Sequence, residues 1–292
     1  MKKTFKTVAL AGKHQSEEVA APLLELAGFL ERRKVKVLLD RQTAALVRSS
    51  QYPAVELDEL GRKADLAIVI GGDGTLLNIA RAVAPHGVAL VGVNQGRLGF
   101  LTDISVDNMI ATIGAILDGR FVAEERMLLE GRVHRDGKQV FEALAFNDVV
   151  VSKGVVGSML VLEARVNGEF IYNQRADGLI VATPTGSTAY ALSSGGPIVH
   201  PSLSVIALVP VSPHTLSNRP IVISSDCAVE IIVRENPEPR VHFDSHSRCD
   251  LRAGDRIVVR RYARPLSLLH PEGHSYYGML REKLNWNREQ GA

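Results

Sequence analysis

Ala64-Asp65-Leu66-Ala67-Ile68-Val69-Ile70-Gly71-Gly72-Asp73-Gly74-Thr75 is the stretch that decides the fold, because an apolar run passes directly into three glycines around one carboxylate. Residues 64–70 have the composition of a buried strand, and a helix is expected to start near Thr75. Glycines can adopt positive φ and turn backbone N–H groups toward phosphate oxygens, and the positive end of a helix adds to the attraction. The pattern predicts a phosphate-binding loop.

Asp73 is a poor residue for a loop that only binds anions. Its carboxylate repels phosphate unless a cation or a proton transfer requires it. This conflict indicates catalysis.

Strands and helices alternate along the first part of the chain. Residues 1–121 are therefore predicted to form an α/β nucleotide-binding domain with a parallel sheet, and its loop lies at the carboxyl end of a strand, where such sheets bind ligands. The expected strands are 8–11, 35–39, 66–70 and 88–93, and the expected helices are 16–33, 76–84 and 106–117.

Residues 122–274 are predicted to form a mostly β domain. Asp136-Gly137 and Asn167-Gly168 are typical hairpin turns between short β-like runs. The expected strands are 128–134, 140–146, 158–166, 170–172, 203–209, 221–224, 229–233 and 256–261. A helical tail within about 275–292 is expected to complete the first domain.

The composition excludes several classes of function. The chain has 292 residues, 34 basic and 32 acidic side chains and a formal net charge of +2, so we expect no nucleic-acid partner. No segment approaches the ~18 continuous apolar residues of a membrane span. The two cysteines, Cys227 and Cys249, have neither metal-ligand spacing nor disulfide density, which favours the cytoplasm.

Two further stretches are candidates for nucleotide binding. Residues 175–197 combine hydroxyl side chains and glycines around an apolar strand, which suits a polar ligand but is equally typical of Ser/Thr-rich turns. Asn147-Asp148 interrupts an apolar run. An amide can bind a base edge and a carboxylate a ribose hydroxyl, although such a pair more often caps local backbone groups.

These stretches, with Gly92 to Thr102 and Pro213 to Leu216, resemble the NAD kinase family in the family's own order over about residues 64–225. The resemblance implies a Rossmann-like, phosphofructokinase-like parallel sheet followed by a β domain. It also implies transfer of the γ-phosphoryl group of ATP to the 2′-hydroxyl of the adenosine ribose of NAD, which makes NADP.

The resemblance also implies roles for individual residues. Asp73 would be the general base, and Asp148 stands where the family more often has Glu. His246 stands where some members carry Gln. The phosphoryl-donor side would be lined by Gly71, Gly72, Gly74 and Thr75, the adenosine half of NAD would be bound by Asn147 and Asp148, its pyrophosphate and nicotinamide ends would lie near Arg175 and Asp177, and the dinucleotide would be lined by Thr188, Ala189, Tyr190, Ala191, Leu192 and Ser193.

The family further implies a divalent cation, normally Mg²⁺, held mainly by the nucleotide phosphates, and we assign no residue as its ligand. The donor would be ATP, with inorganic polyphosphate as an open alternative. A homodimer or homotetramer would form through the β domain.

Three other interpretations stay open on the sequence. Lipid kinases share a Gly-Gly-Asp-Gly-Thr loop, although they are expected to lack the stretches 98–102 and 183–197. A non-catalytic dinucleotide-binding sensor would keep the fold without turnover. His242, Asp244 and His246 alternate along an expected strand and would share a face that suits a metal, although an ordinary polar strand face is the commoner case.

Overall fold

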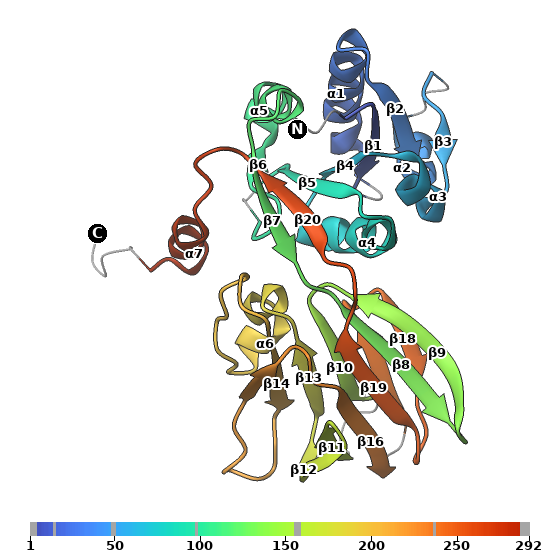
Figure 1. Ribbon diagram of the computed structural model, residues 1–292, viewed down its shortest axis with the longest axis vertical. Helices are drawn as coiled ribbons and strands as arrows, with labels where there is room; N and C mark the ends of the chain where they lie inside the picture. The colour runs from blue at the N-terminus through green and yellow to red at the C-terminus, as the bar shows by residue number, and fades with distance from the viewer. Residues whose placement is uncertain are drawn as a thin grey trace. The chain divides into compact units, whose positions relative to one another are not determined.

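The computed structural model describes residues 5–13, 16–47, 51–96, 99–154, 159–235 and 238–286. The chain divides into two compact units (Figure 1). The first comprises Met1–Glu125 and Leu266–Ala292, and the second comprises Arg126–Pro265. Residues 122–125 and 266–274 therefore fall in the first unit and not in the expected second domain of 122–274, because strands at both of these positions join the first sheet.

The first unit is built on an eight-stranded sheet in the order β3-β2-β1-β4-β5-β20-β7, with β6 paired to β5. Neighbours from β3 to β20 run parallel, as the alternating sequence pattern predicts. The strands are β1 (Thr7–Gly12), β2 (Lys36–Asp40), β3 (Ala54–Val55), β4 (Leu66–Ile70), β5 (Ala89–Asn94), β6 (Ile104–Ser105), β7 (Val122–Arg126) and β20 (Leu266–His270).

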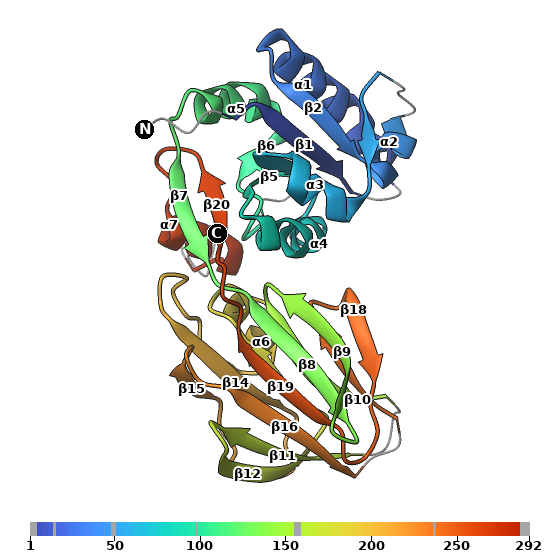
Figure 2. The same cartoon turned by 45° about the vertical axis from the view of Figure 1, so that its right-hand side comes forward.

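Helices lie on both faces of this sheet (Figure 2). Leu23, Leu26 and Leu30 of α1 and Ile113 of α5 are buried in one core with the sheet. The helices are α1 (Ala20–Arg32), α2 (Arg41–Val47), α3 (Leu57–Lys63), α4 (Asp73–Val83), α5 (Met109–Leu117) and α7 (Tyr276–Leu284), with short 3₁₀ turns at Glu17–Val19, Ala84–His86 and Val106–Asn108.

Residues 64–75, the stretch that decides the fold, form a strand followed by the start of a helix. All five residues of β4 are buried, as predicted. The helix begins at Asp73, earlier than the expected position near Thr75, and Gly72 is its N-cap with φ −95°. Asp73 in the first turn is favoured by the positive end of the helix dipole.

The second unit consists of two six-stranded antiparallel sheets in the orders β15-β14-β13-β10-β17-β18 and β12-β11-β16-β19-β8-β9. The strands are β8 (Leu129–Arg135), β9 (Lys138–Ala145), β10 (Asp148–Lys153), β11 (Leu160–Val166), β12 (Glu169–Ala176), β13 (Gly178–Ala182), β14 (Val205–Val211), β15 (Ile221–Ser224), β16 (Val229–Glu235), β17 (Pro239–Phe243), β18 (Ser247–Asp250) and β19 (Arg256–Arg261). A 3₁₀ turn (Thr185–Thr188) and a short helix, α6 (Tyr190–Ser193), follow β13.

One core lies between these two sheets. It contains buried side chains of both sheets, among them Leu162 of β11, Val181 of β13 and Phe243 of β17. The predicted hairpin turns are confirmed, because Asp136-Gly137 has φ values of 50° and 76° and Asn167-Gly168 has 53° and 82°. The chain thus has the expected fold class of an α/β unit with a parallel sheet and a mostly β unit.

Within the described part of the chain, no helix combines the length and the apolar character needed to cross a membrane.

Gly92 allows a loop to pass directly over β5. A Cβ atom there would lie 2.5 Å from the carbonyl oxygen of Leu101 and 2.9 Å from Cα of Thr102. We predict that Gly92→Ala destabilises the first unit by about 1–3 kcal/mol, because backbone must move to admit the methyl group. Gly28→Ala in α1 is the control, where the nearest atom is 3.6 Å away.

Because alanine suits a helix interior better than glycine, the control is expected to be neutral or stabilising by up to about 1 kcal/mol. Thermal unfolding followed by calorimetry measures both variants. Equal melting temperatures for Gly92→Ala and the wild type would contradict this account.

Candidate functional site

Asp73 is held by the loop that follows β5. Its Oδ2 accepts a hydrogen bond from the backbone N–H of Phe100 at 2.8 Å, and its Oδ1 accepts from the N–H of Leu101 at 3.1 Å and from Oγ1 of Thr102 at 3.2 Å. Three donors fix the orientation of the carboxylate. Among the described residues Oδ2 has one hydrogen bond, so a lone pair remains for a further proton.

Buried polar groups anchor this loop to the sheet. Asn94, the last residue of β5, donates from Nδ2 to Oγ1 of Thr102 at 2.9 Å and accepts at Oδ1 from the N–H of Gly96 at 2.6 Å. A Cβ at Gly99 would lie 2.0 Å from Oδ1 of Asp73. The stretch 92–102 thus positions Asp73, although Arg97 and Leu98 lie outside the described residues.

The loop does not use the left-handed conformation that its glycines permit. None of Gly71, Gly72 and Gly74 has a positive φ, so the expectation of left-handed glycines in this loop is wrong. The helix begins early enough that ordinary backbone conformations make the turn. A Cβ at Gly72 or Gly74 would meet no atom within 4 Å, so these two glycines leave open space at the N-terminus of α4. Thr75 is half-buried on the same turn.

In the second unit, Asp244 organises the Asn147-Asp148 pair. Its carboxylate accepts hydrogen bonds from the backbone N–H groups of Phe146 at 2.7 Å, Asn147 at 2.8 Å and Asp148 at 3.1 Å. Asp244 follows β17 in a turn with φ 49°. Because β17 pairs with β10, this turn and the residues that precede β10 meet at one edge of the sheet.

Asp148 is buried, with 6% of its surface exposed. Burial, and to a lesser extent the neighbouring charge of Asp244, raises the pKa of Asp148 from its ordinary 3.8 to about 7. The Oδ1 of Asn147 is also buried and has no hydrogen-bond partner among the described residues. Two polar side chains of this edge therefore have unused hydrogen-bonding capacity, which points to a polar ligand.

The segment after β13 lies against the same edge. Oγ1 of Thr183 donates to the carbonyl oxygen of Phe146 at 2.7 Å and accepts from the N–H of Gly186 at 3.0 Å. A Cβ at Gly186 would lie 2.1 Å from the carbonyl oxygen of Asn147, so only glycine permits this close approach. The structure thus brings residues 183–188 and 146–148 together.

The remainder of the glycine-rich stretch continues from this point. Oγ1 of Thr188 donates to the carbonyl oxygen of Thr185 at 3.2 Å. Ala191 of α6 is buried, whereas 46% of Tyr190 is exposed. Ala189 and Leu192 are half-buried and Ser193 is exposed.

Arg175 and Asp177 lie at the opposite end of β13 from this edge. Asp177 immediately precedes β13 and Thr183 immediately follows it, so six residues of extended chain, about 20 Å, separate them. Asp177 forms an ion pair with Nζ of Lys153 at 2.6 Å, and Arg175 on β12 is exposed. In the second unit of a single chain, these two residues therefore lie away from Asn147.

His246 lies beside Asp244, with its Nδ1 2.7 Å from the Asp244 carbonyl oxygen. The metal hypothesis for His242, Asp244 and His246 is wrong. Positive φ values at Asp244 and Ser245 end the strand face, and the Asp244 carboxylate is already occupied by three backbone N–H groups. Asp103, His270 and His274 form the group of possible metal ligands that the described residues contain.

Sequence reasoning missed two residues of the second unit that support the site. The sequence pattern indicates Asp244 only as a possible metal ligand, because its contacts with residues 146–148 form only in the folded sheet. Arg126, of which 2% is exposed, donates from Nη1 to Oγ1 of Thr185 at 3.2 Å. No signal in the sequence distinguishes this arginine from a surface one.

Comparisons with known proteins identify the family of this chain. The model of the ATP-NAD kinase N-terminal domain matches residues 8–121, and that of the C-terminal domain matches residues 146–270. Relatives named NAD kinase from Nitrosospira multiformis and Nitrosomonas eutropha are 58% and 57% identical over 287 and 283 residues. The alignments cover 98% of this chain and 98% of the first relative, and 97% of this chain and 96% of the second.

Solved structures show the same fold. The yeast NADH kinase complexed with NADH superposes with a TM-score of 0.90 at 23% identity, over 99% of this chain and 90% of that chain. The NAD kinase from Archaeoglobus fulgidus in complex with ATP gives 0.75 at 26% identity, over 96% and 98%. These matches and the site place the protein among enzymes of the kinase class. The chain belongs to the NAD kinase family.

The raised pKa of Asp148 makes stability depend on pH. The native state keeps the Asp148 proton up to about pH 7, whereas the unfolded chain loses it near its ordinary pKa of 3.8. The native state binds more protons between these values, so this group lowers the free energy of unfolding as the pH rises through that window. Asp148→Asn is expected to remove this negative slope.

Urea denaturation of both proteins from pH 4.5 to pH 8 measures the difference, with Asp226→Asn, an exposed position of the same unit, as the control. Parallel stability curves for Asp148→Asn and the wild type would show that Asp148 titrates normally.

Proposed function

We propose that the protein transfers the γ-phosphoryl group of ATP to the 2′-hydroxyl of the adenosine ribose of NAD, making NADP. The observation that carries this proposal is the fixed Asp73 carboxylate at the start of α4, beside glycines that leave open space. Two NAD kinase relatives with more than half of their residues identical support the choice of NAD as acceptor.

In this proposal Asp73 is the general base. A ribose hydroxyl attacks phosphorus well only if its proton is accepted in place. The N–H groups of Phe100 and Leu101 hold the direction of the carboxylate, and Oδ2 retains acceptor capacity for the proton. Gly71, Gly72, Gly74 and Thr75 would face the phosphoryl donor, where the N-terminus of α4 favours negative charge.

The second unit would recognise the acceptor. The buried Oδ1 of Asn147 has no described partner and is free to accept from an adenine amino group. Asp148 would bind a ribose hydroxyl, and residues 188–193 with His246 would line the dinucleotide. Backbone positions at this edge are fixed by Asp244 and Thr183, so recognition would need little rearrangement.

A divalent cation, expected to be Mg²⁺, would neutralise charge on the transferred phosphoryl group. Mg²⁺ prefers oxygen ligands and keeps several waters, so the phosphates of ATP would supply most of its ligands. No residue of this chain is assigned as a ligand of the ion, because the remaining acceptor site of Asp73 is needed for the ribose proton. Inorganic polyphosphate would need the same contacts and is the alternative donor.

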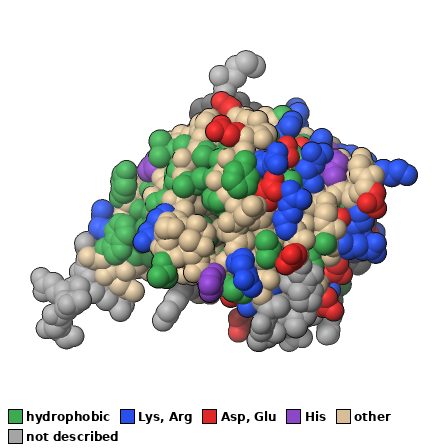
Figure 3. All heavy atoms as spheres, turned by 90° about the horizontal axis from the view of Figure 1, so that it is seen from below, with side chains coloured by type: hydrophobic (Ala, Val, Ile, Leu, Met, Phe, Trp, Pro, Cys, Tyr) green, Lys and Arg blue, Asp and Glu red, His purple; other side chains and the backbone are tan. Residues whose placement is uncertain are grey.

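We also propose a homodimer or homotetramer formed through the second unit, in the cytoplasm. Hydrophobic side chains gather on part of the surface in Figure 3. The edge strands β12 and β15 expose Phe170 at 51% and Val222 at 45%. Exposed apolar edge strands are typical association surfaces. Association would allow Arg175 and Asp177 to serve the dinucleotide site of another subunit. Both cysteines are free, which supports a reducing compartment.

Asp73→Asn tests the catalytic role. The amide keeps the size of the side chain but accepts a proton poorly, so the turnover number is expected to fall by ~10²-fold or more. Binding of NAD should be retained. The assay incubates NAD, ATP and Mg²⁺ and follows NADP with an NADP-specific dehydrogenase. Asp58→Asn, on the exposed face of α3, should keep wild-type turnover.

The same assay separates the alternatives. If folded wild type binds NAD but makes no NADP with ATP or with polyphosphate, the protein is a sensor and the kinase proposal fails. If wild type is active and Asp73→Asn retains its rate, the reaction stands but the base is another group.

Phe170→Asp tests the oligomer. A charge on the exposed edge strand β12 should weaken association by at least ~10-fold, because the new carboxylate would be buried in the interface without a partner. Sedimentation velocity across a concentration series measures the shift to monomers. Leu24→Asp is the matched control, since Leu24 is 41% exposed on α1 of the other unit. Equal sedimentation of both variants and the wild type would place the interface elsewhere.

A further inference from the structure

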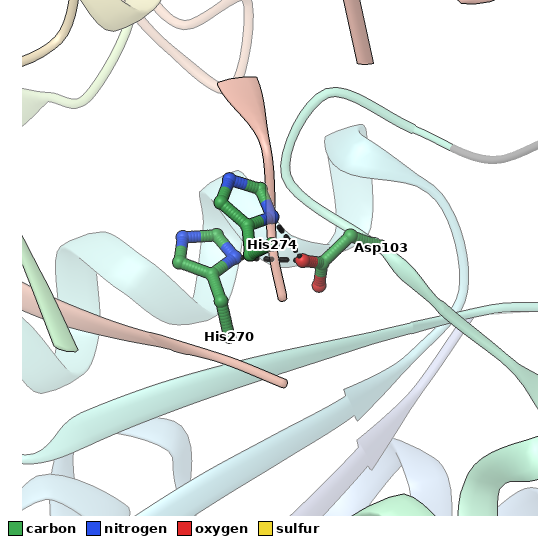
Figure 4. Close-up of side chains that lie close together, drawn as sticks. All are labelled: Asp103, His270 and His274. Atoms are coloured by element: carbon green, nitrogen blue, oxygen red, sulfur yellow. Dashed lines mark hydrogen bonds and ion pairs between the residues drawn. The ribbon is translucent and has the colours of Figure 1, made fainter. Parts of the chain in front are cut away.

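Two histidines and an aspartate meet in the first unit, outside the proposed phosphate loop (Figure 4). His270 ends β20, His274 follows in the turn before α7, and Asp103 lies between Thr102 and β6. Nδ1 of His270 and Nδ1 of His274 each lie 2.8 Å from the same oxygen, Oδ2 of Asp103. The three residues come from segments about 170 positions apart in sequence, since the separations are 167 and 171.

The turn after β20 brings the second histidine back onto the first. The N–H of His274 donates to the carbonyl oxygen of Pro271 at 3.1 Å, and Gly273 has φ 86°. As a result the two imidazoles stack, with centroids 3.8 Å apart and an angle of 20° between the rings. Nδ1 of each ring thus faces Oδ2 of Asp103.

The cluster is buried. The side chains of His270, Asp103 and His274 are 1%, 8% and 11% exposed. Oδ1 of Asp103 has no hydrogen-bond partner among the described residues, and neither has Nε2 of His274. Buried polar atoms without a partner point to a bound ligand.

A second carboxylate completes the arrangement. Oε2 of Glu124, on β7, lies 3.2 Å from Nε2 of His270. His270 thus has a carboxylate at each ring nitrogen. Metal-binding histidines commonly have this environment, in which one nitrogen binds the ion and the other donates its proton to a carboxylate that orients the ring.

We propose that Asp103, His270 and His274 bind a divalent transition-metal ion of the Zn²⁺ class, with Glu124 orienting His270. The three donor atoms lie within 4.8 Å of one another. In a tetrahedral zinc site with bonds of about 2.1 Å, neighbouring donors lie about 3.4 Å apart, so each Nδ1–Oδ2 distance of 2.8 Å would lengthen by about 0.6 Å when the ion binds. Two imidazole nitrogens and one carboxylate oxygen favour zinc over Mg²⁺, which prefers oxygen.

The ion would brace the loop that positions Asp73. Asp103 directly follows Thr102, whose hydroxyl donates to Asp73. The metal would tie this loop to the end of β20 and to the turn before α7. The site would therefore be structural and separate from the cation that accompanies ATP.

Cobalt binding tests the proposal independently of kinase activity. Untagged full-length protein is treated with a chelator and titrated with Co²⁺, whose visible d–d bands report tetrahedral nitrogen and oxygen ligands. We expect one ion per chain, no competition from excess Mg²⁺ and displacement by Zn²⁺. His274→Gln should weaken binding by ~100-fold, and Glu124→Gln by ~10-fold. His86→Gln, an exposed histidine of the same unit, is the control.

Two results would overturn the proposal: absence of Co²⁺ bands and of Zn²⁺ binding in the wild type, or unchanged binding in His274→Gln. Circular dichroism verifies that each variant is folded. X-ray absorption of the zinc-loaded wild type requires no variant and should show scattering from two imidazoles. Fewer than two imidazoles, or sulfur, at the zinc would also overturn it.

Discussion

The structure around the proposed phosphate loop depends on one constraint, the carboxylate of Asp73 held by backbone N–H groups. The donors are Phe100 and Leu101, with the hydroxyl of Thr102 beside them. Charge-assisted hydrogen bonds of this kind are stronger than neutral ones, and three of them leave the side chain little freedom. They also explain Gly92 and Gly99, because larger residues at either position would push the loop away.

A second carboxylate performs a similar task in the other unit. Asp244 accepts from three consecutive backbone N–H groups and thereby fixes the chain just before β10. Its charge also contributes to the raised pKa of its neighbour Asp148, although burial is the larger cause. In both units, then, an acidic side chain organises backbone from a distant segment, and only one of the two, Asp73, is proposed to react.

Sequence reasoning succeeded where the physics is local. An apolar run followed by glycines predicts a strand and a loop, and Asp-Gly or Asn-Gly pairs predict turns, because both depend on a few neighbouring residues. It failed for β20, whose place beside β5 depends on a pairing between residues nearly 180 positions apart. It also misread the turn at Asp244 as a continued strand, because no residue there requires a positive φ.

The sequence by itself determined the fold class, the phosphate loop and, through its resemblance to a known family, the candidate base and nucleotide-binding residues. Tertiary structure alone decided which of them meet. It joined Asn147, Thr183 and Asp244 at one sheet edge, left Asp177 at the far end of β13, and gathered Asp103, His270 and His274 into a cluster. The physical reason is that strand pairing and burial set these distances. Both depend on contacts between segments that are remote in sequence.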